Sequence, residues 1–222
     1  IDQADVFGVR GNNVEGAFGH STGPVSGDLN NDGILDLLIT NLAHPRYIEF
    51  SDKNMLLINQ GPPEYHYADR FAESGIAFEE TNSDPALADV DNDGDLDLYM
   101  TSIYPGRYSH LYLNDGNRFF TDATWLSGAG VENSWGTAFA DYNNDGFSDL
   151  VVASENGLRL FQNTGASTHW IKVKIKDEKC NRHGIGATVT IKYNAREQIR
   201  EIAAGRGTGS QDDAVLIFGL GD

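Results

Sequence analysis

The stretch that decides the fold reads DLNNDGILD at residues 28–36, and it returns as DVDNDGDLD at residues 89–97 and as DYNNDGFSD at residues 141–149. In all three copies oxygen-bearing side chains stand at loop positions 1, 3, 5 and 9, and glycine stands at position 6. The glycine permits a sharp turn that brings the neighbouring side chains back toward one point. Ca²⁺ takes about six to eight oxygen ligands, so this pattern indicates three calcium-binding loops.

Two other structures use similar sequences. A solvated Asx turn also favours Asn-Asp-Gly, but three copies in one register argue against three unrelated turns. An EF-hand requires a bidentate glutamate at position 12 and a helix on each side, whereas position 12 here is Ile39, Met100 or Val152. Short apolar runs rich in strand-forming residues follow each loop. Each loop is therefore predicted to join one β-strand to the next.

The loops belong to a longer repeat. Their first aspartates, Asp28, Asp89 and Asp141, lie 61 and 52 residues apart. A strand of small residues precedes each loop, an apolar strand follows it, and the next predicted strand ends in asparagine, at Asn59, Asn114 and Asn163. Four short strands in a unit of about 50 to 60 residues are typical of a β-propeller blade. The predicted fold class is therefore all-β, with three β-propeller blades.

These units resemble the FG-GAP/VCBS repeats, whose blades bind calcium through loops of this pattern. The resemblance covers roughly residues 15–165 and implies about three Ca²⁺ sites, one per loop, within what is commonly a seven-bladed propeller. It implies side-chain ligands at positions 1, 3, 5 and 9 and a backbone oxygen at position 7. The implied ligands are Asp28, Asn30, Asp32, Ile34 and Asp36; Asp89, Asp91, Asp93, Asp95 and Asp97; and Asp141, Asn143, Asp145, Phe147 and Asp149. The middle loop, which has five aspartates, is expected to bind the cation most tightly.

A second domain is predicted to begin after residue 166. Residues 1–166 carry 7 Lys and Arg against 26 Asp and Glu, whereas residues 167–222 carry 9 against 7. The acidity of the chain therefore belongs to the blades. Four strands are predicted in this domain, at residues 170–176, 186–193, 198–202 and 214–218. The first of them alternates, which places Lys172, Lys174 and Lys176 on one face. We interpret this face as solvated rather than as a site for an anionic partner.

This second segment resembles the ASPIC/UnbV domain, which follows such blades in the cartilage acidic protein-like family. The matching stretches are HWIKV at 169–173, NRHGIGATV at 181–189, GRGTGSQ at 205–211 and FGLG at 218–221. The family pattern continues with a further strand and turn, so the domain is expected to be incomplete. Three blades also fall short of the ~4 to 8 that close a propeller. We therefore expect further blades, from the same longer chain or from other chains.

Composition and charge argue against several functions. A net charge of −17 disfavours nucleic acid as a partner. No apolar run approaches the ~20 residues of a membrane-spanning helix. Because Cys180 is the single cysteine, no disulfide can form within the chain. Calcium loops in extracellular modules bind weakly and would be empty in cytosol, so the expected localisation is extracellular or periplasmic.

The sequence contains no recognisable catalytic constellation. Cys180 and His183 could form half of a zinc site, but no second pair accompanies them. The glycine-rich stretch at 205–209 lacks the following helix that a phosphate loop needs, so it is interpreted as a turn. Trp125, Trp135 and the tyrosines are interpreted as residues that pack within the blades rather than as a sugar platform. We therefore expect a non-catalytic, calcium-stabilised scaffold that binds an extracellular protein or glycan, or serves in adhesion, with no other cofactor. Two alternatives remain: a secreted enzyme acting on polysaccharide at the propeller centre, and a scaffold subunit of a larger complex.

Overall fold

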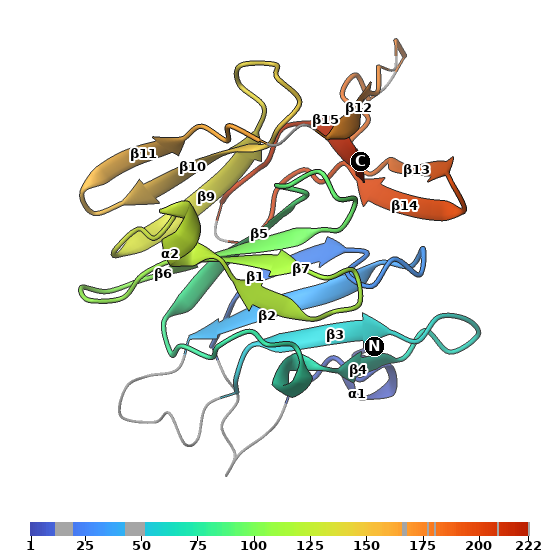
Figure 1. Cartoon of the computed structure of the whole chain (residues 1–222). Coiled ribbons are helices and arrows are strands. Elements are labelled where there is room, and N and C mark those ends of the chain that lie inside the picture. Colours follow the sequence, from blue (N-terminus) through green and yellow to red (C-terminus); the bar gives the residue numbers. More distant parts are fainter. Residues whose placement is uncertain are drawn as a thin grey trace.

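The computed structural model describes residues 1–11, 20–42, 52–165, 168–176, 178–179, 181–207 and 209–221, and the structure below is that of these residues. They form an almost entirely β-structure (Figure 1). The short helical segments are α1 (Ala4–Phe7), η2 (Phe71–Glu73) and α2 (Thr124–Ser127). The predicted all-β class is confirmed.

The first two repeat units are four-stranded antiparallel sheets with strands in chain order. Blade 1 consists of β1 (His20–Gly27), β2 (Asp36–Leu42), β3 (Met55–Asn59) and β4 (Tyr67–Asp69). Blade 2 consists of β5 (Asn82–Ala88), β6 (Asp97–Ser102), β7 (His110–Asn114) and β8 (Phe120–Asp122). The prediction of four short strands per unit is confirmed for both blades.

The third unit has three strands among the described residues. Blade 3 consists of β9 (Ser134–Ala140), β10 (Asp149–Ser154) and β11 (Gly157–Phe161), in the order β11-β10-β9. In every blade the acidic loop connects the first two strands at the same register, because Gly27 pairs with Asp36, Ala88 with Asp97 and Ala140 with Asp149. The loops therefore join strand to strand, as predicted.

The blades pack face to face around two apolar clusters. One cluster joins blades 1 and 2 and includes Leu38 and Leu98, both fully buried. The other joins blades 2 and 3, where Tyr99 meets Phe139 edge-on at 6.5 Å between ring centroids. Strand β5 lies against both β1 and β9, so the first strands of the three blades lie side by side (Figure 1).

The aromatic residues divide between the core and the surface. Tyr99 and Tyr112 are buried among the blades, which confirms blade packing for them. Trp125 and Trp135 are 67% and 54% exposed, so the interpretation of these tryptophans as blade packing was wrong. An apolar side chain in a blade strand is buried only where a neighbouring blade covers that face.

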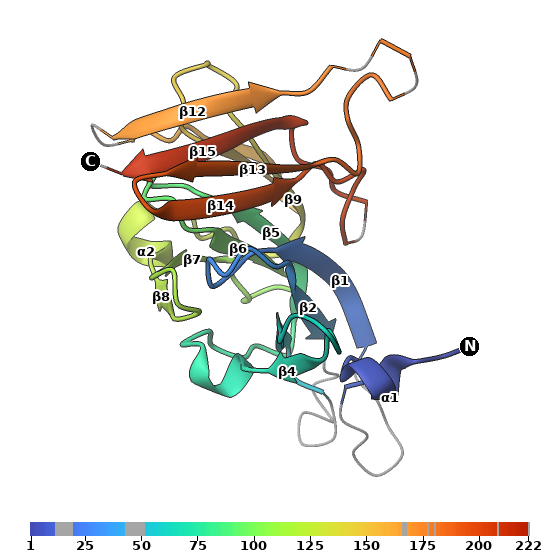
Figure 2. The same ribbon diagram turned by 90° about the vertical axis from the view of Figure 1, so that its right-hand side faces the viewer.

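The C-terminal residues form two two-stranded sheets that do not extend a blade. Strand β12 (His169–Lys174) pairs with β15 (Val215–Gly221), and β13 (Thr188–Tyr193) pairs with β14 (Arg196–Glu201), all antiparallel. The four predicted strands of this segment are thus present. Figure 2 shows them as a layer over one end of the blades. The predicted boundary after residue 166 lies outside the described residues.

Candidate metal centre and its cover

Each acidic loop is held in shape by its first aspartate. The Oδ2 atom of that aspartate accepts a hydrogen bond from the amide of the glycine at position 6. The pairs are Asp28 with Gly33 at 2.9 Å, Asp89 with Gly94 at 3.1 Å, and Asp141 with Gly146 at 2.6 Å. The three glycines have φ values of 81°, 105° and 94°, a region that side chains other than glycine rarely adopt.

The last aspartate of each loop fastens the loop to the third strand of its blade. One carboxylate oxygen accepts from the amide at loop position 2, and the other accepts from the amide of the asparagine that closes the third strand. For Asp97 these donors are Val90 at 2.8 Å and Asn114 at 2.9 Å. Asp36 and Asp149 make the same pair of bonds in their blades.

The aspartates and asparagines at positions 3 and 5 accept amide hydrogen bonds two residues along the loop. In loop 2, the amide of Asp93 donates to Asp91 at 3.2 Å and the amide of Asp95 donates to Asp93 at 2.9 Å. Where position 3 is asparagine, its Nδ2 also donates to the carboxylate at position 5, as Asn143 does to Asp145 at 2.7 Å. The backbone therefore consists of Asx turns whose side-chain oxygens lie close together.

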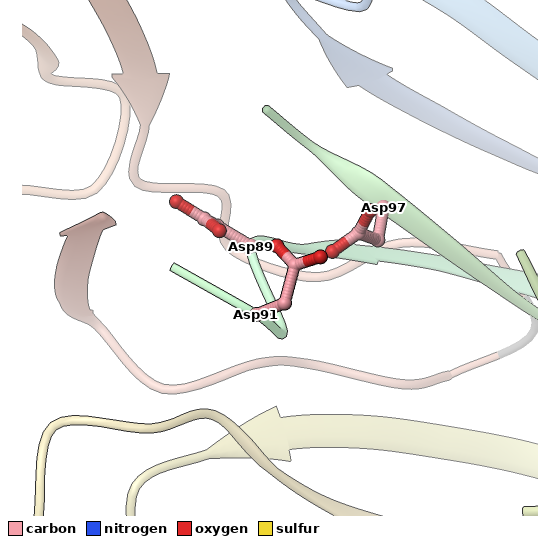
Figure 3. A group of neighbouring side chains, drawn as sticks. All are labelled: Asp89, Asp91 and Asp97. Atoms are coloured by element: carbon pink, nitrogen blue, oxygen red, sulfur yellow. The ribbon is translucent and has the colours of Figure 1, made fainter. Parts of the chain in front are cut away.

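The middle loop brings together the donor set of a cation site. Carboxylate oxygens of Asp89, Asp91 and Asp97 lie within 4.8 Å of one another, and Figure 3 shows the Asp91 carboxylate between the other two. Asp89 is 3% exposed, and its Oδ1 has no hydrogen-bond partner among the described residues. A buried carboxylate oxygen without a donor is costly unless a cation or water binds it. This all-oxygen donor set fits a hard divalent cation.

Burial changes the acidity of these carboxyl groups. Burial raises the pKa of Asp36 and of Asp89 to about 7, and it raises that of Asp93 to about 6. Burial, together with the neighbouring Asp91, raises the pKa of Asp97 well above its usual range. The raised pKa values mean that it is unfavourable to ionise these buried, neighbouring carboxyl groups together. A bound divalent cation would offset this cost of ionisation.

The side chain of Asp95, at position 7 of the middle loop, contacts the neighbouring turn and blade 1 instead of the other carboxylates. The Asp95 side chain at position 7 accepts from Asn31 Nδ2 at 2.6 Å and lies against Gly116. The side chains of Ile34 and Phe147, also at position 7, cover Gly61 and Gly165 in the same way. These side chains cover the turn after the third strand, so only a backbone oxygen of position 7 remains as a ligand.

Two sets of asparagines, those at loop position 4 and those that close the third strand of a blade, form contacts that the sequence did not predict. Asn31, Asn92 and Asn144, at loop position 4, have left-handed φ values of 57°, 60° and 63°. Asn31 and Asn92 each donate to the next blade, to Asp95 and to the Gly146 carbonyl at 3.1 Å. The only signal for them was their recurrence at one position.

The closing asparagines also cross between blades. Asn114 Nδ2 donates to the Leu29 carbonyl of blade 1 at 3.1 Å and to the Leu96 carbonyl of its own blade at 3.0 Å. Asn163 Nδ2 donates likewise to the Val90 carbonyl of blade 2 at 2.6 Å. Asn114 thus ties the loop of blade 1 to blade 2, and Asn163 ties the loop of blade 2 to blade 3.

The C-terminal strands cover the middle loop. The amide of Gly219 in β15 donates to Asp89 Oδ2 at 2.9 Å, and the amide of Gly221 donates to the Asn92 carbonyl at 3.0 Å. A Cβ atom on Gly219 would lie 2.3 Å from the carbonyl carbon of Asn92, so only glycine fits there. The guanidinium of Arg200, buried in β14, donates to the Gly94 carbonyl at 3.0 Å.

The third loop is covered by β12. Lys172 Nζ lies 2.5 Å from Asp141 Oδ2, with the lysine side chain 22% exposed and the aspartate side chain 2% exposed. The indole of Trp170 packs directly on Gly146. Burial by itself would raise the pKa of Asp141, but the hydrogen bond from Lys172 helps to hold this pKa below its usual value. The interpretation of the lysine face as solvated was therefore wrong for Lys172, whereas Lys174 is exposed.

The glycine-rich stretch forms a turn that inserts Arg206 between β5 and β9. Its guanidinium donates to the Pro85 carbonyl at 2.6 Å and the Thr137 carbonyl at 2.7 Å, and it contacts Asp212 at 2.7 and 2.9 Å. It also lies 3.2 Å from Asp84, whose side chain is fully buried. The turn is thus a connection between blades and C-terminal strands. Of the suggested half zinc site, Cys180 lies outside the described residues and His183 is exposed.

A cavity of about 390 Å³ lies between the ends of β1, β5 and β9 and the strands β14 and β15. Several charged groups of its lining already have protein partners. Glu201 accepts from Ser26 Oγ at 3.2 Å, Arg206 pairs with Asp212, and Asp141 pairs with Lys172. These groups connect the C-terminal strands to the blades.

Comparison with known families agrees with this architecture. The model of the FG-GAP-like repeat matches residues 28–100 and 89–152, which together span more than half of the chain. The model of the ASPIC and UnbV domain matches residues 177–222. The chain therefore belongs to the FG-GAP-like repeat family and carries an ASPIC and UnbV domain. No curated protein matches it significantly. Among the described residues, no helix has the length and apolar character to cross a membrane.

Proposed function

We propose that this chain is a calcium-stabilised, non-catalytic scaffold that presents its surface to an extracellular protein or glycan. Its FG-GAP-like repeats and its ASPIC and UnbV domain indicate an extracellular type of repeat scaffold. The observation that carries the calcium proposal is the middle loop, where Asp89, Asp91 and Asp97 converge and one buried oxygen of Asp89 lacks a donor. An extracellular or periplasmic location, where calcium is abundant, is part of the same proposal.

In this proposal calcium acts on stability. A cation that binds only the folded chain stabilises it by mass action, by about 2.7 kcal/mol at a concentration 100 times the Kd. Its protein ligands in the middle loop would be Asp89, Asp91, Asp93 and Asp97, with the backbone oxygen of Asp95. The cation would neutralise carboxylates that repel one another, and so lock the corner between the first two strands of each blade.

Thermal unfolding with calcium, with magnesium and with excess chelator tests the proposal. Calcium is expected to raise the Tm, and Asp91→Asn is expected to reduce this response. Glu64→Gln, which removes an exposed carboxylate outside the loops, is the matched control and should respond like the wild type. A wild-type Tm that is the same in calcium and in chelator would contradict structural calcium binding.

We also propose that the middle loop has the highest calcium affinity of the three. It has five carboxylates against three in each of the other loops, and its Asp89 has the unpartnered oxygen. Calorimetry on Asp32→Ala, Asp93→Ala and Asp145→Ala compares the loops directly. Equal losses of calcium binding in the three variants would refute the ranking.

We further propose that another blade covers the exposed face of blade 3. Leu111 stands three residues before Asn114 and is 8% exposed, because blade 3 covers it. Leu160 stands three residues before Asn163, at the equivalent place, and is 59% exposed. The covering blade would come from the same longer protein or from another chain. A native source protein of 24.2 kDa that stays monomeric would contradict this.

A further inference from the structure

We infer that Lys172 is the built-in counter-ion of the third loop, so that this loop takes no divalent cation while the C-terminal strands are docked. The inference rests on the proposed calcium function of the loops and restricts it to the first and second loops. Lys172 is then a residue that determines how many cations the blades hold.

The position-1 aspartate of the third loop has both its oxygens engaged by protein groups. Asp141 Oδ1 accepts from the amide of Asp145 at 3.1 Å. Asp141 Oδ2 accepts from the amide of Gly146 at 2.6 Å and contacts Lys172 Nζ at 2.5 Å. The ammonium also reaches Asn144 Oδ1 at 3.4 Å. This nearly buried ion pair places a positive charge against the carboxylate that a cation would need.

The middle loop differs at this same position. Asp89 Oδ2 accepts from two amides, of Gly94 and of Gly219, and its Oδ1 is unpartnered. The C-terminal strands give the middle loop a neutral donor to Asp89 and also the Arg200 guanidinium, which donates to the Gly94 carbonyl and forms no ion pair within 4.0 Å with Asp89, so one oxygen of Asp89 stays free. In the third loop the positive charge is in direct contact with the position-1 carboxylate. A divalent cation at the third loop would be repelled by the ammonium, and that repulsion is strong where burial lowers the local dielectric.

The lysine is fixed in place by the strand that carries it. Trp170 and Lys172 are two residues apart in β12 and so share a face of the strand. The Trp170 indole rests on Gly146, where a Cβ atom would lie 1.9 Å from the ring. The partner strand β15 is anchored on the middle loop through Gly219. The backbone of Lys172 is therefore held beside the third loop as long as the C-terminal strands stay docked, and the ammonium stays within reach of Asp141.

The loops also differ in how much negative charge remains. The third loop has three carboxylates, one of which is paired with Lys172, whereas the middle loop has five. The first loop has three carboxylates, and among the described residues none of them forms an ion pair within 4.0 Å. The attraction for a divalent cation is therefore smallest at the third loop.

Calcium titration calorimetry on the full chain tests the inference. The wild type is expected to bind two calcium ions, and Lys172→Met is expected to bind three. Lys172→Gln, which keeps a hydrogen-bonding group without the charge, is expected to behave in the same way. The matched control is Lys174→Met, an exposed lysine of the same strand, which should bind two. Adding Asp145→Ala to Lys172→Met should remove the third ion again.

Terbium luminescence gives a second measurement that reports on the third loop itself. Because the Trp170 indole lies on Gly146, excitation of that tryptophan should sensitise terbium bound at this loop. Lys172→Met is expected to increase the sensitised signal by more than about tenfold over the wild type, as loss of a buried like charge predicts. Adding Trp170→Phe to Lys172→Met should abolish the gain.

The outcomes separate this inference from the proposed function. A wild type that binds three ions, or a Lys172→Met variant and a Lys172→Gln variant that both bind as many as the wild type, overturns the role of Lys172 alone. A wild type that binds none, with variants that bind one, supports the role of Lys172 and refutes calcium binding at the first two loops. Failure of every variant to bind refutes both.

Discussion

Removing the side chain of Asn114 tests whether one asparagine joins blades 1 and 2. Its Nδ2 donates to the carbonyls of Leu29 and Leu96, and its Oδ1 accepts from the amide of Gly116 at 3.2 Å. Asn114 is 5% exposed, so water cannot readily replace these three bonds. In Asn114→Ala all three are lost, while the backbone amide can still donate to the loop aspartate.

The expected loss follows from the number of bonds. A hydrogen bond contributes about 1 kcal/mol net, so three bonds predict a fall of about 3 kcal/mol in the free energy of unfolding. The buried carbonyls left without donors push the loss upward. Asn114→Asp should lose at least as much, because it keeps the acceptor but sets a carboxyl group against two carbonyls.

Urea unfolding, followed by tryptophan fluorescence and by circular dichroism, measures this loss. The matched control is Asn117→Ala, an exposed asparagine three residues further on, which should change stability by less than about 0.5 kcal/mol. If Asn114→Ala falls within that same margin, the asparagine does not join the blades and the reasoning is refuted.

Three further predictions concern the C-terminal strands and the second blade. Arg206→Met removes the cationic partner of the fully buried Asp84 carboxylate and should lower the free energy of unfolding in urea by about 3 to 5 kcal/mol. The control is the exposed ion pair of Lys192 with Glu197, where Lys192→Met should lower it by less than about 1 kcal/mol. Gly219→Ala would set a Cβ atom 2.3 Å from the backbone of the middle loop, so protection of that loop from hydrogen exchange should fall, and unchanged protection would contradict the docking. The Glu79 carboxylate, whose Oε1 lies 3.6 Å from His110 Nε2, raises the pKa of His110 above its usual value of 6.5. The stability that this ion pair contributes is therefore complete below 6.5 and is lost as pH rises through the raised value, so the wild type should lose more stability than His110→Gln between about pH 6 and pH 9.

The sequence predicted the elements that depend on contacts between near neighbours. The three loops, the strands on either side of them and the four C-terminal strands are all present. The turn at Gly33, for example, depends on Asp28 only five residues away. Hydrogen bonds between residues this close in the chain recur in every copy of the loop. The residues that form them therefore recur at a fixed spacing in the sequence, and this spacing reveals them.

Contacts between distant segments could not be predicted in this way. Lys172 stands in a regular alternation that looks the same on a solvated strand and on a strand docked on an acidic loop. Arg206 lies in a glycine-rich stretch whose turn was predicted, but its partners are on β5 and β9, far away in the sequence. The exposure of Trp135 likewise depends on whether another element covers its face, and a strand pattern does not contain that information.

The bond between Gly219 and Asp89 joins residues that are 130 apart in the chain. Closing so long a stretch costs more conformational entropy than closing a nine-residue loop within a blade. Distant contacts of this kind also slow folding, because the chain orders much of itself before the contact forms. On a ribosome, the middle loop emerges well before the strand that covers it. The newly made blade therefore passes through a period in which its acidic loop is open to the solvent, and during that period water and ions, rather than the amides of β15, contact its carboxylates.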